Sequence, residues 1–134
     1  MIDAALKQRV RERALHRCEY SRLRQEHEPD RRFHIEHIIA RRHSGADDDS
    51  NLALACTLCN LQKGACIGSL DPDSNELTRL FHPRRDDWTQ HFRRDGAMIL
   101  GLTDIGRTTV WLLDMNCDDR VKMRLALHAL GELD

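Results

Sequence analysis

Two spacings of apolar residues run along the first half of this chain, and each predicts a different element. Over residues 2–17 the aliphatic side chains recur at helical spacing with Lys and Arg between them, which predicts an amphipathic helix. Residues 33–39 alternate apolar and polar side chains, the period of a half-buried strand. Residues 51–55 read as a second short extended piece, and we expect a short helix from near Asn60 to Gly64.

The second half of the chain gives clearer boundaries. Turn-forming residues fill 71–75, and the dipeptide Asp95-Gly96 predicts a hairpin turn before a strand over 97–102. We further expect a short helix through Trp88 and Phe92 and two longer helices over 104–114 and 118–131. The pattern as a whole predicts an α+β fold, with one unit over residues 1–70 and a C-terminal α+β extension over 71–134 packed against it.

Composition sets the size of the core and narrows the class of protein. The chain has 134 residues, of which 40% are apolar and 32% charged, the balance of a globular protein with one modest core. Only six residues are aromatic, and we expect Trp88 and Trp111 to anchor the core. No apolar run approaches the roughly 18 residues of a membrane span, and the N-terminus lacks a signal-like stretch, so we expect a cytoplasmic protein without a membrane partner.

Charge is distributed unevenly, although the formal net charge is only −1. Residues 1–43 carry a balance of +4 and the remaining residues one of −5. Nucleic-acid-binding proteins usually show a basic footprint. Here the footprint is regional, which supports a DNA partner weakly.

The five cysteines are an odd number, which argues against a closed disulfide framework. Cys56 and Cys59 form a Cys-x-x-Cys pair, and Cys18 lies upstream. In a reducing compartment clustered cysteines more often bind a metal. Cys66 and Cys117 stand apart from this group.

Four polar residues have the chemistry of phosphodiester hydrolysis. Glu36 and His37 end the first predicted strand, Asn51 follows fourteen residues after His37, and Asn60 follows nine residues later. An imidazole can act as the base that activates water near neutral pH. A carboxylate and an amide oxygen are hard ligands suited to Mg²⁺ or Mn²⁺, which would neutralise charge on the phosphate. We expect the Asn51 side-chain carbonyl to hold the imidazole in one tautomer.

The segments 33–39 and 51–60 resemble the HNH endonucleases, in the variant that has Asn at the last motif position. The resemblance implies the ββα-metal fold, His37 as general base and Asn51 as the residue that orients it. It also implies Glu36 and Asn60 as ligands of one catalytic divalent cation. The motif covers residues 18–64, and the segment 80–88 looks like the tail of a bacterial HNH subgroup.

Zinc-bearing HNH proteins hold a structural zinc with two Cys-x-x-Cys pairs. Here the first pair reads Cys18-Glu-Tyr-Ser21, so the predicted zinc ligands are Cys18, Cys56 and Cys59 with Ser21 at the fourth position. A neutral hydroxyl is a poorer zinc ligand than a thiolate. Three outcomes are open: a three-thiolate zinc with water, a substitute ligand from His16, His27 or Cys66, or no zinc.

The predicted function is metal-dependent hydrolysis of DNA phosphodiester bonds. A single site makes one cut, so a monomer should nick DNA and a homodimer would be needed to cut both strands together. Arg41, Arg42 and Lys63 are candidate phosphate contacts, and a phosphate is expected near the start of the helix that Asn60 opens. The alternatives are a DNA-binding relative with weak or lost cleavage and a zinc-stabilised interaction module.

Overall fold

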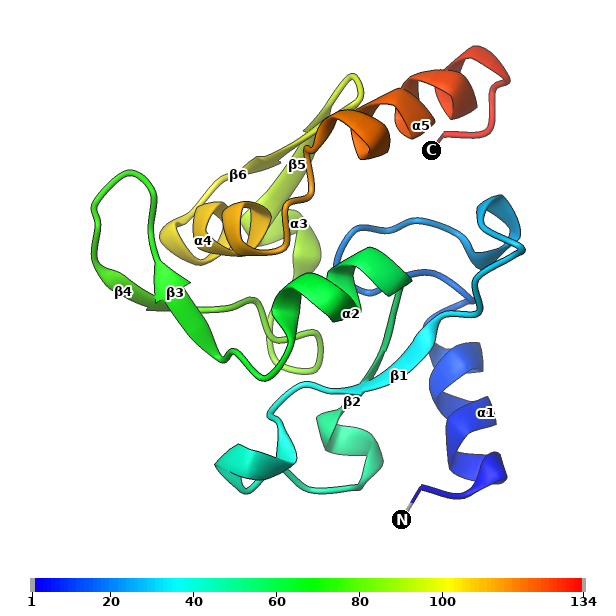
Figure 1. Ribbon diagram of the computed structural model, residues 1–134, viewed down its shortest axis with the longest axis vertical. Coiled ribbons are helices and arrows are strands. Elements are labelled where there is room, and N and C mark those ends of the chain that lie inside the picture. Colours follow the sequence, from blue (N-terminus) through cyan, green and yellow to red (C-terminus); the bar gives the residue numbers. More distant parts are fainter. Residues whose placement is uncertain (1, 134) are drawn as a thin grey trace.

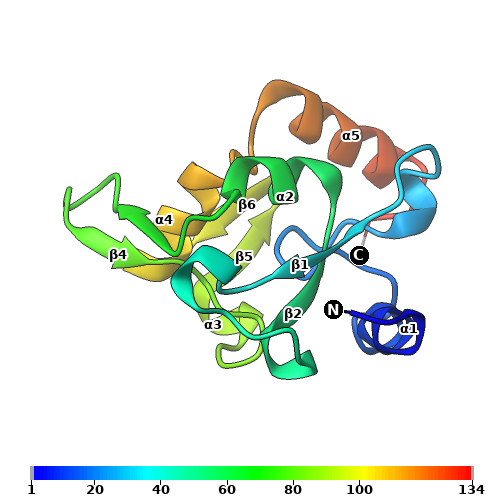
Figure 2. The same cartoon turned by 60° about the horizontal axis from the view of Figure 1, so that its bottom comes forward.

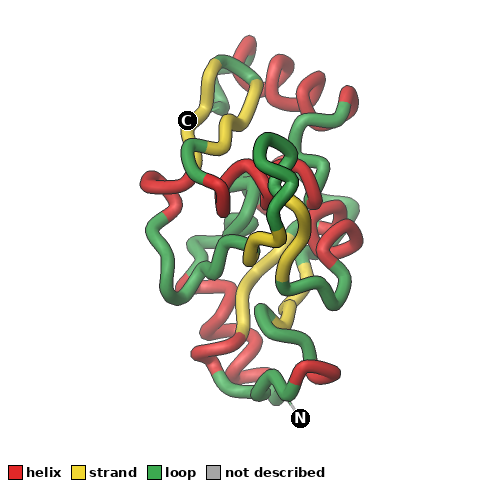
Figure 3. Tube along the Cα trace, turned by 90° about the vertical axis from the view of Figure 1, so that its left-hand side faces the viewer, coloured by secondary structure: helices red, strands yellow, loops and turns green. Residues whose placement is uncertain are grey.

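Three short antiparallel hairpins and the helices packed on them make up the part of the chain that the computed structural model describes, residues 2–133 (Figure 1). The strands pair as β1 with β2, β3 with β4 and β5 with β6, and loops connect most of the elements (Figure 3). The predicted α+β class is thereby confirmed. The elements in chain order are α1 (Ala4–Arg13), β1 (His34–His37), β2 (Leu52–Ala55), α2 (Thr57–Lys63), β3 (Gly68–Leu70), β4 (Leu77–Arg79), α3 (Trp88–His91), β5 (Phe92–Asp95), β6 (Met98–Gly101), α4 (Asp104–Leu112) and α5 (Asp118–Ala129).

Helix α1 begins and ends on local backbone chemistry. Asp3 caps its start, since its carboxylate accepts a hydrogen bond of 2.8 Å from the amide of Leu6. The helix ends at Arg13, earlier than the predicted residue 17, because Leu15 and His16 both adopt left-handed backbone angles that a right-handed helix cannot contain. Within α1 only Val10 is buried, so only a narrow face of the helix packs against the core.

The β1–β2 hairpin and α2 form a continuous ββα unit. The register pairs His34 with Ala55 and His37 with Leu52, and all four residues of β2 are buried. Helix α2 follows β2 directly and packs beside β1 (Figure 2). It starts at Thr57, three residues before the predicted start, because the extended backbone of Cys56 already forms its N-cap.

The chain after α2 builds a second group of elements. The β3–β4 hairpin pairs Leu70 with Leu77 and so spans the predicted boundary at residue 70, while α4 packs on both strands. The predicted hairpin forms between β5 and β6, but its turn is Gly96-Ala97, with Gly96 at φ 61°, because Asp95 still pairs with Met98. Phe92 opens strand β5 instead of ending a helix. Helices α4 and α5 lie within a few residues of their predicted ranges.

One continuous apolar core joins the two halves. It includes Tyr20, Phe33 and Leu52 from the first half and Phe92 and Ile99 from the second. No described helix is both long enough and apolar enough to cross a membrane.

The two tryptophans have different environments. Trp88 is half-buried against the core and its indole N–H donates to the carbonyl of Tyr20 at 2.8 Å. Trp111 is 68% exposed, so its prediction as a core anchor is wrong. The inner face of α4 instead presents Thr108 and Thr109 to the core, both fully buried.

Candidate functional site

His37 ends strand β1 and has one ring nitrogen fixed and the other free. Its Nε2 lies 2.7 Å from Oδ1 of Asp47, and the side chain is 19% exposed. No hydrogen-bond partner of Nδ1 is found among residues 2–133. A carboxylate at one nitrogen orients an imidazole and stabilises its protonated form, which is the arrangement of a histidine base.

Asp47 was not singled out from the sequence, although it lies in the loop that the three consecutive aspartates mark. Arg41 holds the same carboxylate with its Nε at 3.0 Å and a terminal nitrogen at 3.2 Å. The hydrogen bonds from His37 and Arg41 hold the pKa of Asp47 well below its ordinary value. The Asp47 carboxylate is therefore negatively charged when the His37 imidazole becomes protonated, and it can balance that positive charge.

Asn51 is buried but does not touch the imidazole. Its Oδ1 accepts from the amide of Ile39 and its Nδ2 donates to the carbonyls of Ile39 and Ala46, each at 2.9 Å. The expectation that the Asn51 carbonyl holds the His37 ring is therefore corrected. Asn51 closes the loop between β1 and β2 at its base, and this closure places Asp47, the next residue after Ala46, against His37.

Gly45 allows the same loop to close tightly. A Cβ at this position would stand 1.7 Å from the carbonyl oxygen of Ile39 and 2.9 Å from Nδ2 of Asn51. Only glycine leaves room for the backbone to pass there.

Glu36 points to the opposite side of β1, into the interface with α2. Its side chain is 4% exposed and its Oε1 lies 3.0 Å from Nζ of Lys63. The Tyr20 hydroxyl contacts its two oxygens at 2.9 and 3.2 Å. Burial raises the pKa of Glu36, and the Lys63 ammonium and the Tyr20 hydrogen bond oppose part of that rise.

Lys63 is an interior residue, so its prediction as a DNA contact is wrong. Its side chain is only 2% exposed, and besides Glu36 it donates to the carbonyl of Ile38 at 2.9 Å. A buried lysine is stable only when its charge is paired. Lys63 therefore fastens the end of α2 to β1.

Asn60 lies in the second turn of α2, on the side of the helix that faces β1. Lys63 is three residues further on and reaches Glu36, and residues at this spacing share one helix face. Asn60 is half-buried, and its side-chain amide has no hydrogen-bond partner within residues 2–133. Its backbone amide donates to the carbonyl of Cys56 at 2.9 Å, so Asn60 does not open the helix, and the phosphate site expected at such a start is corrected.

The two other candidate phosphate contacts lie on the surface. Arg41 and Arg42 belong to a short 3-10 turn over Arg41–His43, and both are exposed. Arg41 is occupied in part by Asp47. Their contact with DNA stays a prediction.

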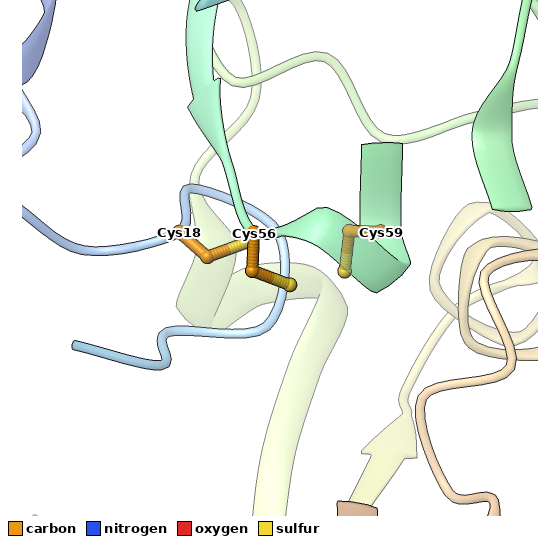
Figure 4. A group of neighbouring side chains, drawn as sticks. All are labelled: Cys18, Cys56 and Cys59. Carbon is orange, nitrogen blue, oxygen red and sulfur yellow. The ribbon is translucent and has the colours of Figure 1, made fainter. Parts of the chain in front are cut away.

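Cys18, Cys56 and Cys59 converge in the interior (Figure 4). Cys18 comes from the loop after α1, Cys56 lies between β2 and α2, and Cys59 lies in the first turn of α2. All three are at most 1% exposed, and their sulfur atoms lie within 4.8 Å of one another. Tetrahedral zinc, with Zn–S bonds of about 2.3 Å, holds sulfurs about 3.8 Å apart, so the trio fits such an ion.

The acidity of the three thiols differs. Burial by itself raises the pKa of Cys18, but hydrogen bonds from Cys56 and Cys59 lower it well below its ordinary value. The hydrogen bond to Cys18 raises the pKa of Cys56 to about 12, and burial raises that of Cys59. Cys18 is therefore the most acidic thiol of the trio.

The fourth position holds Ser21, as the sequence indicates. Its hydroxyl lies 3.7 Å from the sulfur of Cys56, and its amide donates to the sulfur of Cys18 at 3.4 Å. None of the proposed substitutes joins the trio within the described residues: His27 groups with Glu26 and Glu132 instead, Cys66 is exposed, and His16 is in neither group.

Residues 17–65 match the family model described as HNH endonuclease. No curated protein and no solved structure matches the chain. The matched range contains the β1–β2 hairpin, α2, the His37 site and the cysteine trio. Residues 17–65 are therefore similar to the HNH endonucleases, and this range is called the HNH domain.

Proposed function

We propose that this chain is an endonuclease that hydrolyses DNA phosphodiester bonds, with His37 as the general base. The observation that carries the proposal is the His37–Asp47 pair inside an HNH domain. The pair leaves one imidazole nitrogen open at a partly exposed position, where a water molecule has access. A binding module has no use for a histidine prepared in this way.

In the proposed hydrolysis, His37, Asp47 and Asn51 each have one role. Nδ1 of His37 takes a proton from a water molecule, which attacks phosphorus opposite the leaving 3′ oxygen. Asp47 stabilises the imidazolium that forms, because its carboxylate lies 2.7 Å from Nε2. Asn51 keeps Asp47 in place through the loop that it closes.

The donor set near β1 and α2 fits a hard divalent cation. Within residues 2–133, the side-chain amide of Asn60 has no hydrogen-bond partner and Oε2 of Glu36 has only the 3.2 Å contact with Tyr20, so acceptor capacity remains on each. Mg²⁺ and Mn²⁺ prefer such oxygens. Glu36 and Asn60 would hold the ion, which would neutralise charge on the phosphate and on the departing oxygen.

A plasmid-nicking assay tests the proposal. Supercoiled DNA is incubated with the protein and Mg²⁺ or Mn²⁺, and His37→Ala is compared with His34→Ala, a change at an exposed histidine on the same strand. Loss of a general base costs about 10²–10⁴ in rate, so His37→Ala should lose nicking while His34→Ala retains it.

The assay also separates the rival functions. Equal nicking by wild type and His37→Ala removes the mechanism. Salt-dependent DNA binding without nicking in the wild type identifies a DNA-binding relative, because phosphate contacts weaken steeply with salt. Neither binding nor nicking identifies an interaction module.

A further inference from the structure

Arg120 connects the C-terminal extension to the cysteine trio. It lies in the first turn of α5, is 8% exposed, and its Nη2 lies 3.0 Å from the sulfur of Cys59 and 3.7 Å from that of Cys56. Its other terminal nitrogen donates to the carbonyls of Leu113 and Asp114. Helix α5 is far from α1, at the other end of the molecule (Figure 1), so this contact joins it to the centre of the HNH domain.

The surroundings of Arg120 hold positive charge in excess. Among residues 2–133 no carboxylate forms an ion pair with it. Arg124, one turn further along α5, is also buried and donates to carbonyl oxygens, those of Ala97, Met115 and the Asn116 amide. Buried guanidinium groups without an anion are costly. Among the described residues, the cysteine sulfurs are the groups in direct contact with Arg120 that can supply negative charge, whereas the Glu28 carboxylate interacts with it electrostatically without an ion pair.

Charge arithmetic fits a zinc ion with three thiolates. Three thiolates around one Zn²⁺ carry a single negative charge, which one guanidinium cancels. A fourth thiolate at the position of Ser21 would leave a second negative charge without a partner. Ser21 at the fourth position and the guanidinium of Arg120 therefore both match a site with three thiolates. Ser21, Cys56 and Arg120 also line a cavity of about 590 Å³.

We propose that Arg120 is the charge partner of a zinc centre formed by Cys18, Cys56 and Cys59, and that this contact couples zinc binding to the docking of α5. Zinc sites depend on the groups around their ligands, whose loss typically costs 10–100-fold in metal affinity. Arg120 acts on the sulfurs and does not ligate the ion. The proposal is independent of nuclease activity.

The test measures zinc affinity of the full chain by competition with a chromophoric chelator. Wild type should bind one zinc per chain, and Arg120→Met should bind it about 10–100-fold more weakly. Arg120→Lys, which keeps the charge, should recover part of the affinity. Arg124→Met is the matched control, since it removes an equally buried arginine of α5 that touches no sulfur, and its zinc affinity should change less than about threefold.

A second measurement covers the case in which Arg120→Met does not fold. Hydrogen exchange of wild type is followed with zinc and after chelation, and amides of α5 should exchange faster without zinc while those of α4 change little. The proposal would be overturned if the wild type binds no zinc, or if Arg120→Met binds zinc as tightly as the wild type. It would also be overturned if Arg124→Met weakens zinc binding as much as Arg120→Met, or if amide exchange in α5 is the same with and without zinc.

Discussion

Replacing Lys63 by Met removes the positive half of a buried ion pair and largely keeps the space that the side chain fills. Lys63 and Glu36 are 2% and 4% exposed, and their charged atoms lie 3.0 Å apart. Removal of one partner of such a pair typically costs about 3–5 kcal/mol, because the other charge stays buried without compensation. At about 2.1 cal/mol/K of unfolding entropy per residue, this lowers Tm by about 10–18 °C.

The cost of Lys63→Met must depend on pH through Glu36. Burial raises the pKa of Glu36 above its ordinary value of 4.5, and Lys63 limits that rise. A carboxyl whose folded pKa is raised contributes stability below its unfolded pKa and loses it as pH rises through the folded pKa. Without Lys63 the folded pKa rises further. The full cost is therefore expected at pH 8, whereas near pH 5 a protonated Glu36 leaves a smaller loss of about 1–2 kcal/mol from hydrogen bonds.

Thermal unfolding at both pH values, in the presence of a metal chelator with equal treatment of all variants, checks this reasoning. Lys122→Met, at an exposed position of α5, should change stability by no more than about 0.5 kcal/mol. Glu36→Gln combined with Lys63→Met should recover most of the loss at pH 8. A cost that is the same at pH 5 and pH 8, or a double variant no more stable than the single one, would refute the buried-pair argument.

Three further predictions follow from other contacts. Asp47→Asn should lower nicking about 10–100-fold, less than His37→Ala, because the base remains but loses its counter-charge; equal rates would exclude Asp47. Asn51→Ala should destabilise the fold by about 2–4 kcal/mol in chemical denaturation, since three backbone groups lose a partner. Arg107 lowers the pKa of Asp71 to about 2, so the stability from that contact is present above the ordinary value of 3.8 and is lost as pH falls toward 2; acid titration of Asp71→Asn should lack this component.

The elements that were predicted correctly from the sequence are those whose conformation is determined by the local pattern of residues. Alternation over 33–39 placed β1, and the spacing of Glu36, His37, Asn51 and Asn60 identified the HNH unit. Turn chemistry placed the β5–β6 hairpin. The end of α1 was missed because Leu15 and His16 are ordinary residues in left-handed conformations, and nothing local marks them.

Partner choice in the site was harder to predict, because it depends on how loops close. Asp47 is one of three adjacent aspartates, and only the closure by Asn51 brings that one to His37. Lys63 looked like a surface cation at the end of a short helix, but packing of α2 on β1 turns it inward. Nothing in the sequence indicates that a lysine in a polar segment is buried. Its burial depends on whether the fold brings a carboxylate next to it.

The loop over residues 18–21 explains why the extension matters to the HNH domain. Arg84, beyond β4, forms an ion pair with Glu19, and Trp88 donates to the carbonyl of Tyr20. The Tyr20 hydroxyl in turn contacts Glu36, Cys18 belongs to the cysteine cluster that could hold a metal, and Ser21 contacts that cluster. Because one short loop carries all of these contacts, the extension fixes both the surroundings of Glu36 and the cysteine trio by holding that loop. The HNH domain and the extension are therefore parts of one site as well as of one core.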